Sequence, residues 1–303
     1  MSFSKQKTRD YLIGFVFVLA MISLATWSGD IETIMPELGP LTTGLWIYHN
    51  REWMYHPENI FLGPSGAALI GFLVNMLAIS YGLKVFVTIA LIVLLLRFLN
   101  SPLAPSFATG LLPVLTNATH WSYIFTVLGF TLILMIAIIL RNHPGNGSER
   151  TPMSLKHMAI YLVASLIWVT AVGLAGRGQM AGIPPVMVVF FEVLEKPDYN
   201  GKLAIRQVLA LTGAAAIGVG VHLVVAPWLM AAAISLPLVF GLLSALKLKL
   251  PAAYAFPVLA LVLPQAMFKM LPLTTILAAS FFLGFTVAYR RLAVEPIFAS
   301  KNN

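Results

Sequence analysis

The sequence predicts an all-α polytopic membrane protein of about 12 transmembrane helices, arranged as two parallel six-helix repeats. Hydrophobic residues fill 59% of the 303 positions and charged residues only 10%, whereas a soluble domain is about 25% charged. Apolar runs of roughly 17–22 residues recur along the chain, and a helix of that length crosses a bilayer core of about 30 Å. The segment Ser65–Gly71 (SGAALIG) returns 147 positions later as Thr212–Gly218 (TGAAAIG). Duplicated bundles of apolar helices are common among membrane transporters.

The expected spans follow one another with short loops between them. Those of the first half are at about 11–28, 33–48, 60–78, 83–99, 102–116 and 121–140, and those of the second at about 157–176, 182–195, 205–223, 227–245, 251–265 and 270–289. The first run follows Lys5, Lys7 and Arg9 and resembles a signal peptide. It lacks a small-residue cleavage site, so we expect a retained helix. Twelve spans of about 20 residues leave no room for a sizeable soluble domain.

The only substantial connector lies in the middle of the chain and divides it into two halves. It is polar and contains the run Pro144–Gly147 (PGNG), which is typical of a loop. The sequence therefore predicts transmembrane repeat 1 at 1–141, a cytoplasmic linker at 142–156 and transmembrane repeat 2 at 157–303.

The positions of the basic residues predict the orientation. With a cytoplasmic N-terminus, all but three of the 19 Lys and Arg residues fall on the cytoplasmic side, the exceptions being Lys84, Arg177 and Lys269. This bias is the positive-inside rule. It predicts a multi-pass protein of the inner or plasma membrane with both termini cytoplasmic, and halves that run parallel because each crosses an even number of times. The basic residues are spread over many short loops, so we expect no nucleic-acid partner.

Prolines interrupt spans at matching places in the two halves. Pro102, Pro105 and Pro113 lie in one span, and its counterpart contains prolines at 251, 257 and 264. The second spans are likewise marked by prolines at 36 and 40 and at 184 and 185. Short or broken segments at corresponding positions indicate a binding site between repeats. The alternative is that these prolines only curve the helices.

Few ionisable residues lie at membrane depth, and these are the candidate substrate-binding residues. Glu37, Glu192 and His222 occur within apolar segments, where a charge costs several kcal/mol unless it is paired or hydrated. Glu192 could instead reach the cytoplasmic interface, and His222 could be an ordinary helix-end residue. Asn75 is the counterpart of His222, 147 positions earlier. Arg206 could hold a carboxylate through paired hydrogen bonds or anchor its helix at the interface.

The repeated glycines and alanines allow helices to approach closely. Packing alone explains them, and a close-packed gate between the repeats is the functional alternative.

Two family resemblances follow from these segments. Arg206 followed by Thr212–Gly218 is similar to the Arg…Gly…Gly pattern of the fusaric-acid-resistance and aromatic-acid-exporter-like superfamily. The segment 101–108 (SPLAPSFA) resembles the proline-bearing segment of its small members. This resemblance implies six helices per repeat and export of organic, often aromatic, anions. The HPP transmembrane family shows a similar plan, but its His-Pro-Pro signature is replaced here by Leu-Ala-Pro at 103–105 and Lys-Leu-Pro at 249–251.

The sequence thus predicts a secondary transporter that exports small organic anions, with proton coupling through Glu37, Glu192 or His222. A passive anion channel of the same fold and a membrane-embedded interaction subunit are the alternatives. We expect no enzyme, cofactor or metal site, because the chain has no cysteine and no P-loop, Gly-x-Ser-x-Gly or His-Glu-x-x-His motif. The expected partners are the lipid bilayer and a small-molecule anion. Whether a membrane-fusion adaptor protein or a second copy of the chain is also a partner is left open by the sequence.

Overall fold

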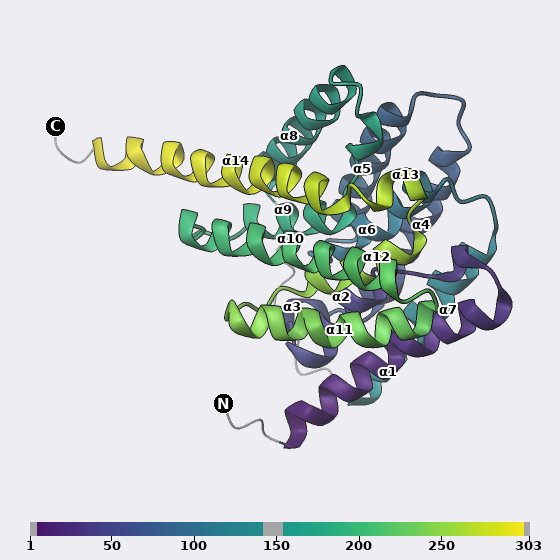
Figure 1. The fold of residues 1–303 in the computed structure, drawn as a ribbon. Coiled ribbons are helices and arrows are strands. Elements are labelled where there is room, and N and C mark those ends of the chain that lie inside the picture. The colour runs from purple at the N-terminus through teal and green to yellow at the C-terminus, as the bar shows by residue number, and fades with distance from the viewer. Residues whose placement is uncertain (1–4, 142–153, 300–303) are drawn as a thin grey trace.

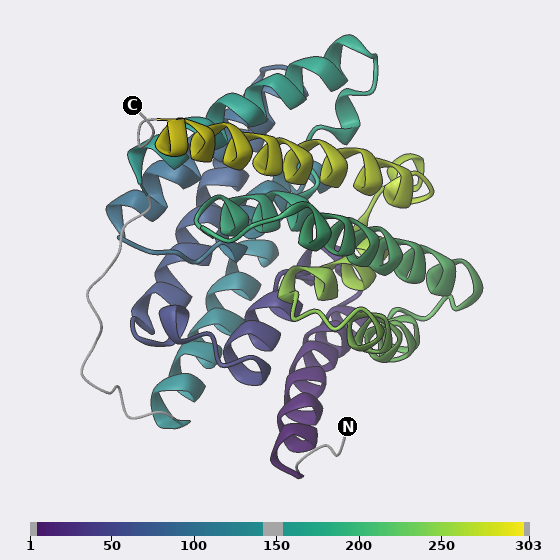
Figure 2. The same cartoon turned by 90° about the vertical axis from the view of Figure 1, so that its left-hand side faces the viewer.

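The computed structural model describes residues 5–141 and 154–299, and within these ranges all regular structure is helical. Figure 1 shows long helices around a set of short ones near the middle of the molecule, which are labelled α2 (Leu38–Thr42), α6 (Pro105–Thr116), α9 (Pro184–Leu194) and α12 (Ala255–Val262). Figure 2 gives the view from the side, in which α1 (Lys5–Ser28) crosses the second-half helices at an oblique angle.

Each of the twelve predicted segments overlaps at least one helix, and a few short helical elements lie between these segments or at their ends. The first half contains α1 (Lys5–Ser28), the 3₁₀ helix η1 (Ile31–Thr33), α2 (Leu38–Thr42), the π-helix η2 (Thr43–Ile47), α3 (Arg51–Met54), α4 (Glu58–Asn75), α5 (Tyr81–Phe98), α6 (Pro105–Thr116) and α7 (Ser122–Arg141). The second half contains α8 (Leu155–Leu174), the 3₁₀ helix η3 (Gly178–Met180), α9 (Pro184–Leu194), α10 (Gly201–Val224), α11 (Trp228–Ala245), the 3₁₀ helix η4 (Pro251–Tyr254), α12 (Ala255–Val262), α13 (Gln265–Phe268) and α14 (Leu271–Ala299).

Two positions of the expected linker 142–156 lie in a helix, because α8 begins at Leu155. Positions 142–153 of that linker lie outside the described residues.

Within residues 5–141 and 154–299, seven helices are long and apolar enough to cross a membrane: α1, α5, α7, α8, α10, α11 and α14. The molecule is therefore a helical membrane protein by the length and composition of its helices. The other five predicted spans are not both long enough and apolar enough to cross a membrane. α4 carries polar residues at both ends, and the remaining four segments are short. α6, with 12 residues, is about 18 Å long at 1.5 Å per residue, and a bilayer core is about 30 Å thick.

Prolines set the bounds of the short helices. Pro105 opens α6, Pro184 and Pro185 open α9, and Pro251 opens η4. Proline is well tolerated in the first turn, where its missing N–H would have no partner anyway. Pro264 follows α12, where the chain turns extended at Leu263. The predicted interruptions are thus helix starts and stops as well as internal prolines such as Pro113.

The short helices form the centre of the molecule. Every residue of α2 and α12 is buried, as are the first eleven residues of α6. In α9 every residue except Glu192 is buried. These four helices contact one another through the pairs α6–α9, α2–α12, α2–η4 and α9–η4. The long helices surround them and present many apolar side chains to the outside.

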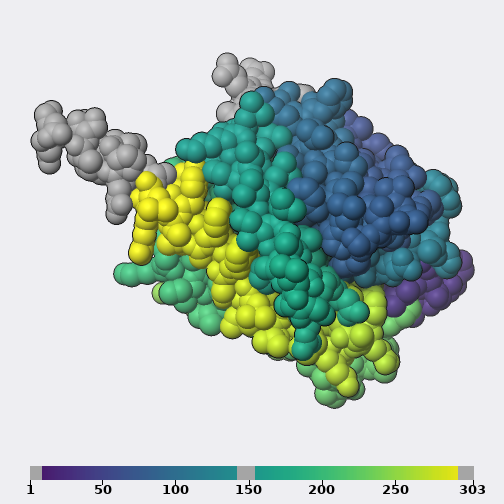
Figure 3. Space-filling model, turned by 90° about the horizontal axis from the view of Figure 1, so that it is seen from above, coloured from purple at the N-terminus to yellow at the C-terminus, as the bar shows by residue number. Residues whose placement is uncertain are grey.

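The same helix pairings occur in the two halves. α4 packs on α5, α6 and α7, and α10 packs on α11, α12 and α14. Two further contacts join the halves, because α8 packs on α5 and α1 packs on α11. Figure 3 shows α8, in teal, lying between first-half helices in blue and α14 in yellow.

The repeated glycine motif lies where helices touch. A Cβ on Gly71 would come 1.8 Å from the carbonyl oxygen of Gly110 in α6, and a Cβ on Gly218 would come 2.9 Å from Cα of Pro257 in α12. The contacting positions are 39 residues apart in both halves. Gly71 and Gly218 therefore permit a close approach of two helices that a larger residue would prevent.

Candidate functional site

Two cavities lie at opposite ends of the short helices. We call them the Lys84 cavity, with a volume of about 390 Å³, and the Glu192 cavity, with a volume of about 580 Å³. The Lys84 cavity borders the end of α6, and the Glu192 cavity borders the end of α9. α6 and α9, with 12 and 11 residues, are about 16–18 Å long, which is shorter than a bilayer core of about 30 Å.

The Lys84 cavity carries one charge among polar amides and apolar walls. Its polar lining comes from Asn75 at the end of α4, Tyr81 and Lys84 at the start of α5, Asn117 after α6 and Gln179 in η3. Its remaining lining is apolar: Ile79, Val114, Leu115, Pro264, Ala266 and Met267. Among the described residues, no carboxylate lines it, so Lys84 is without an acidic partner there.

The Lys84 ammonium group is fixed by the end of the preceding helix. Nζ donates to the backbone oxygen of Asn75 and lies 3.4 Å from its Oδ1. Asn75 in turn donates from Nδ2 to the Ala118 carbonyl at 3.0 Å and to Asn117 Oδ1 at 3.3 Å. A cation near the carbonyl end of a helix is also favoured by the helix dipole. The amide network therefore places Lys84 in one position at the cavity wall.

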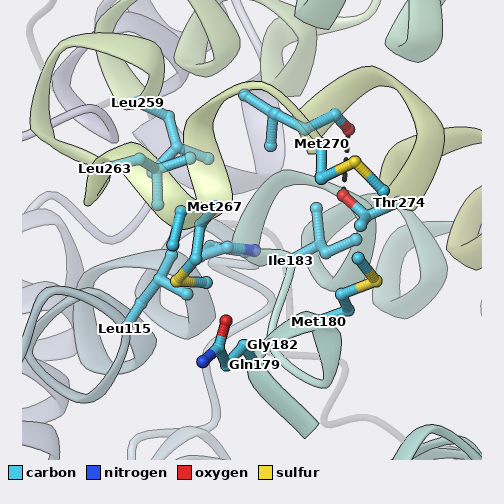
Figure 4. A pocket seen from close by; sticks show the side chains of 13 residues that line it. Leu115, Gln179, Met180, Gly182, Ile183, Leu259, Leu263, Met267, Met270 and Thr274 are labelled. Atoms are coloured by element: carbon cyan, nitrogen blue, oxygen red, sulfur yellow. Dashed lines mark hydrogen bonds between the residues drawn. The ribbon is translucent and has the colours of Figure 1, made fainter. Parts of the chain in front are cut away.

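A narrow crevice continues from the Lys84 cavity, sharing Leu115, Gln179, Ala266 and Met267 with it. Figure 4 shows Met180, Met267 and Met270 converging on it, with the Gln179 side chain between Leu115 and Met180. The crevice has a volume of about 30 Å³, which is room for one or two waters. We call it the methionine crevice. Its thioether chains are flexible and adapt to different apolar shapes.

The Glu192 cavity has a different electrostatic character. Three carboxylates line it (Glu52, Glu192 and Glu195) together with the lysines at 196 and 249. Glu195 also pairs with His157 at 3.1 Å. In the loop that follows, the buried Tyr199 hydroxyl donates to Gln207 Oε1 at 2.8 Å. Burial raises the pKa of this phenol above its ordinary value, so Tyr199 remains a neutral donor.

Buried aromatic side chains fill the space between the cavities. Phe107, Tyr161 and Phe190 are fully buried, and they pack with Phe191, which lines the Glu192 cavity. The ring centroids of Phe107 and Phe191 are 4.8 Å apart, and those of Tyr161 and Phe190 are 4.9 Å apart. The Tyr161 hydroxyl donates to the Met187 carbonyl at 3.2 Å. The cluster therefore lies along α6 and α9, between the residues of these helices that border the two cavities.

Glu37 is also buried and lines neither of the two cavities. Its side chain is 1% exposed, directly before α2, and its Oε2 has no hydrogen-bond partner. A carboxylate in such a place is costly unless it is neutral or balanced. Glu37 therefore remains a functional candidate because of its burial, although no wall of a cavity holds it.

Arg206 and His222 also lie away from both cavities. Arg206 donates from Nε to the Leu246 carbonyl at 3.1 Å and from Nη2 to the Lys247 carbonyl at 3.0 Å. These bonds satisfy the open end of α11. His222 lies near the end of α10, its ring edge-on to Phe268 at 5.3 Å. In this structure Arg206 ties two helices together and His222 packs on an aromatic ring.

The five predicted site residues are thus not brought into one space. Asn75 and Glu192 reach different cavities, and Glu37, Arg206 and His222 reach neither. Sequence reasoning missed Lys84, Tyr81 and Gln179 as cavity residues. A signal for Lys84 existed, because it is one of three basic residues that break the positive-inside bias. Within the described ranges, no group of three or more His, Cys, Asp or Glu side chains could hold a metal ion.

No family model, no curated protein and no solved structure matches this chain.

Proposed function

We propose that this protein is a secondary transporter of small organic anions. The observation that carries the proposal is the pair of cavities at opposite ends of the same buried short helices, with a buried aromatic cluster between them. An alternating-access transporter needs a closed barrier and an approach from each side. Both cavities are lined from both halves of the chain, as expected when the pathway runs between repeats.

The repeat architecture is part of the proposal. We infer two six-helix repeats, each with four long helices around two short central ones. If the short helices count as partial spans, the chain crosses the membrane twelve times. Equal helix pairings in the halves and equal spacing of the glycine contacts support this. Chain positions 1–141 and 157–303 would then be related by a pseudo-two-fold axis along the membrane normal.

The orientation follows from the basic residues. With both termini cytoplasmic, the Glu192 cavity opens to the cytoplasm and the Lys84 cavity to the outside. The membrane would be the inner or plasma membrane. Export is the direction implied by the resemblance to the aromatic-acid-exporter-like superfamily.

The preference for anions comes from the Lys84 cavity. Among the described residues, Lys84 is the only charged side chain that lines it, and in a partly dry site an uncompensated cation attracts anions strongly. The carboxylates of the Glu192 cavity would make anion binding weaker on the cytoplasmic side than at Lys84.

Flux through reconstituted protein tests the proposal. Proteoliposomes are loaded with unlabelled benzoate, and uptake of labelled benzoate is measured against empty liposomes. A secondary transporter gives saturable uptake that is stimulated by the internal substrate. Non-saturable flux with single-channel currents would indicate the channel instead. Absence of flux, with a partner protein retained through purification, would indicate the interaction subunit.

Proton coupling is tested at the two acidic candidates. If Glu37 or Glu192 carries the proton, Glu37→Gln or Glu192→Gln should abolish the response of flux to an imposed pH gradient, because an amide cannot titrate. The variant that loses this response should still exchange labelled for unlabelled substrate when the substrate concentration is equal on both sides of the membrane. If both variants keep the full response to the gradient, coupling through these carboxylates is wrong.

A further inference from the structure

We propose that the Lys84 cavity binds a monocarboxylate with a compact apolar body, whose carboxylate lies at Lys84 and whose body lies against Leu115 and Met267. The assignment deepens the proposed function and rests on it for the claim that the bound molecule is cargo. The site itself follows from the lining residues.

The anionic end is assigned from the hydrogen bonds of Lys84. Its ammonium group has three protons, and the structure directs Nζ to two oxygens of Asn75. A third proton is left for a ligand. Asn75 is held in turn by Asn117 and Ala118, so the cation does not have to be ordered when a ligand binds. Preorganisation of this kind increases affinity because less side-chain entropy is lost.

Other hydrogen-bond donors point to the same ligand chemistry. The Tyr81 hydroxyl is buried at the cavity and has no hydrogen-bond partner among the residues that the structure describes. Asn117 uses its Oδ1 as an acceptor from Asn75, which leaves its amide group to donate. A carboxylate has two oxygens and about four acceptor positions. A cation with neighbouring neutral donors and no competing acid matches that arrangement.

The apolar end is assigned from the rest of the lining. Six of the eleven lining side chains are apolar, and the volume of about 390 Å³ lies in the range of small-molecule sites. The methionine crevice extends this wall through Met180 and Met270. Rotation of these flexible thioethers would enlarge the crevice around a ring or a branched chain.

The same lining argues against more strongly charged ligands. A second carboxylate would lie against apolar walls without a cation, and an unpaired buried charge is costly. A positively charged ligand would face Lys84. The cavity therefore selects one negative charge together with apolar surface.

Binding to purified protein in detergent tests the assignment without any flux measurement. Calorimetric titration compares benzoate and cyclohexanecarboxylate with three probes: benzamide, which lacks the charge; acetate, which lacks the body; and benzylammonium, whose charge is reversed. We expect the two apolar acids to bind at least tenfold more tightly than each of the three probes. Equal affinity for benzoate and benzamide, or for benzoate and acetate, would overturn the proposal, as would no binding of either acid.

Variants locate the site. Lys84→Met should weaken benzoate binding at least tenfold, and Lys84→Arg should retain most of the affinity because it keeps the cation. Lys269→Met is the matched control, since Lys269 is exposed on the same side and lines neither cavity. Equal loss from both lysine-to-methionine variants, or no loss from Lys84→Met, contradicts the assignment. If Lys84→Met does not fold, the comparison of probes on the native chain and the Lys84→Arg titration still decide it.

The two proposals fail in different ways. Binding that depends on Lys84, without flux in proteoliposomes, would preserve the site and refute transport. Saturable flux that is insensitive to Lys84→Met, with Lys269→Met also unchanged, would preserve transport and refute the site.

Discussion

A single hydroxyl illustrates how this chain stabilises broken helices in an apolar surrounding. Pro113 lies inside α6 and has no N–H, so the Thr109 carbonyl four residues earlier loses its helical partner. The Tyr123 hydroxyl of α7 donates to that carbonyl at 2.5 Å, and both residues are buried. A freed carbonyl at membrane depth is tolerated when a neighbouring helix satisfies it.

Removing this hydroxyl should destabilise the protein. Tyr123→Phe leaves the Thr109 carbonyl without a partner, and we expect a loss of about 1–2 kcal/mol in the free energy of unfolding, the cost of a buried unsatisfied group. The measurement is reversible unfolding in mixed micelles.

The control restores the bond from within the helix. Pro113→Ala returns an N–H to α6, so Tyr123→Phe in that background should cost far less than in the native one. Equal costs in the two backgrounds would show that the hydroxyl stabilises the fold by some other contact.

The residue scale is also where the sequence predicted least. Glu192 and Asn75 could be predicted as site residues because they are polar side chains within apolar segments. Their separation into two cavities depends on the direction of the short helices. Arg206 has the charge of a substrate ligand, and only its distance to the end of α11 shows that it caps that helix. A side chain's role here depends on which helix end it faces, and such contacts between distant segments are not encoded in local patterns.

At the scale of helices, the sequence predicted much more. Apolar runs and prolines placed all twelve segments on helices, because helix propensity and helix breakers act locally. The number of full spans could not be predicted, because a short buried helix and a membrane-crossing helix have the same apolar composition. The distinction depends on neighbours that cover the short helix on all sides.

The glycine contacts give a prediction for helix packing. Gly218→Ala should lower the free energy of unfolding by about 1–3 kcal/mol, the usual cost of overpacking, because the new methyl group meets the backbone of α12. Gly71→Ala should cost more, since its Cβ would overlap the Gly110 carbonyl.

Gly220→Ala provides the comparison within the same helix. Nothing lies within 4 Å of a Cβ at that position, so the variant should be neutral or slightly stabilising. Thermal unfolding of the three variants in detergent gives the order Gly220→Ala, Gly218→Ala, Gly71→Ala from most to least stable. A different order would mean that α4 and α10 are not held at these contacts.

For the whole molecule, the absence of cysteine makes the orientation directly measurable. Lys269→Cys should react with a membrane-impermeant maleimide on intact cells, and Lys202→Cys should react only after permeabilisation, because both side chains are exposed at opposite ends of the bundle. The unsubstituted chain, which has no cysteine, is the control for non-specific labelling. The reverse pattern would invert the assignment of the two cavities to the two sides.

The pairing of α1 with α11 has a consequence for biogenesis. Tyr11 meets Phe240 with ring centroids 4.7 Å apart, yet about 200 residues separate the end of α1 from the start of α11. At 5–20 residues per second, the first helix leaves the ribosome roughly 10–40 s before that partner exists. Its α11-facing side must meanwhile rest on lipid or on an insertion factor. A nascent chain stalled before residue 228 should therefore expose α1 to lipid-phase cross-linkers from which the finished protein protects it.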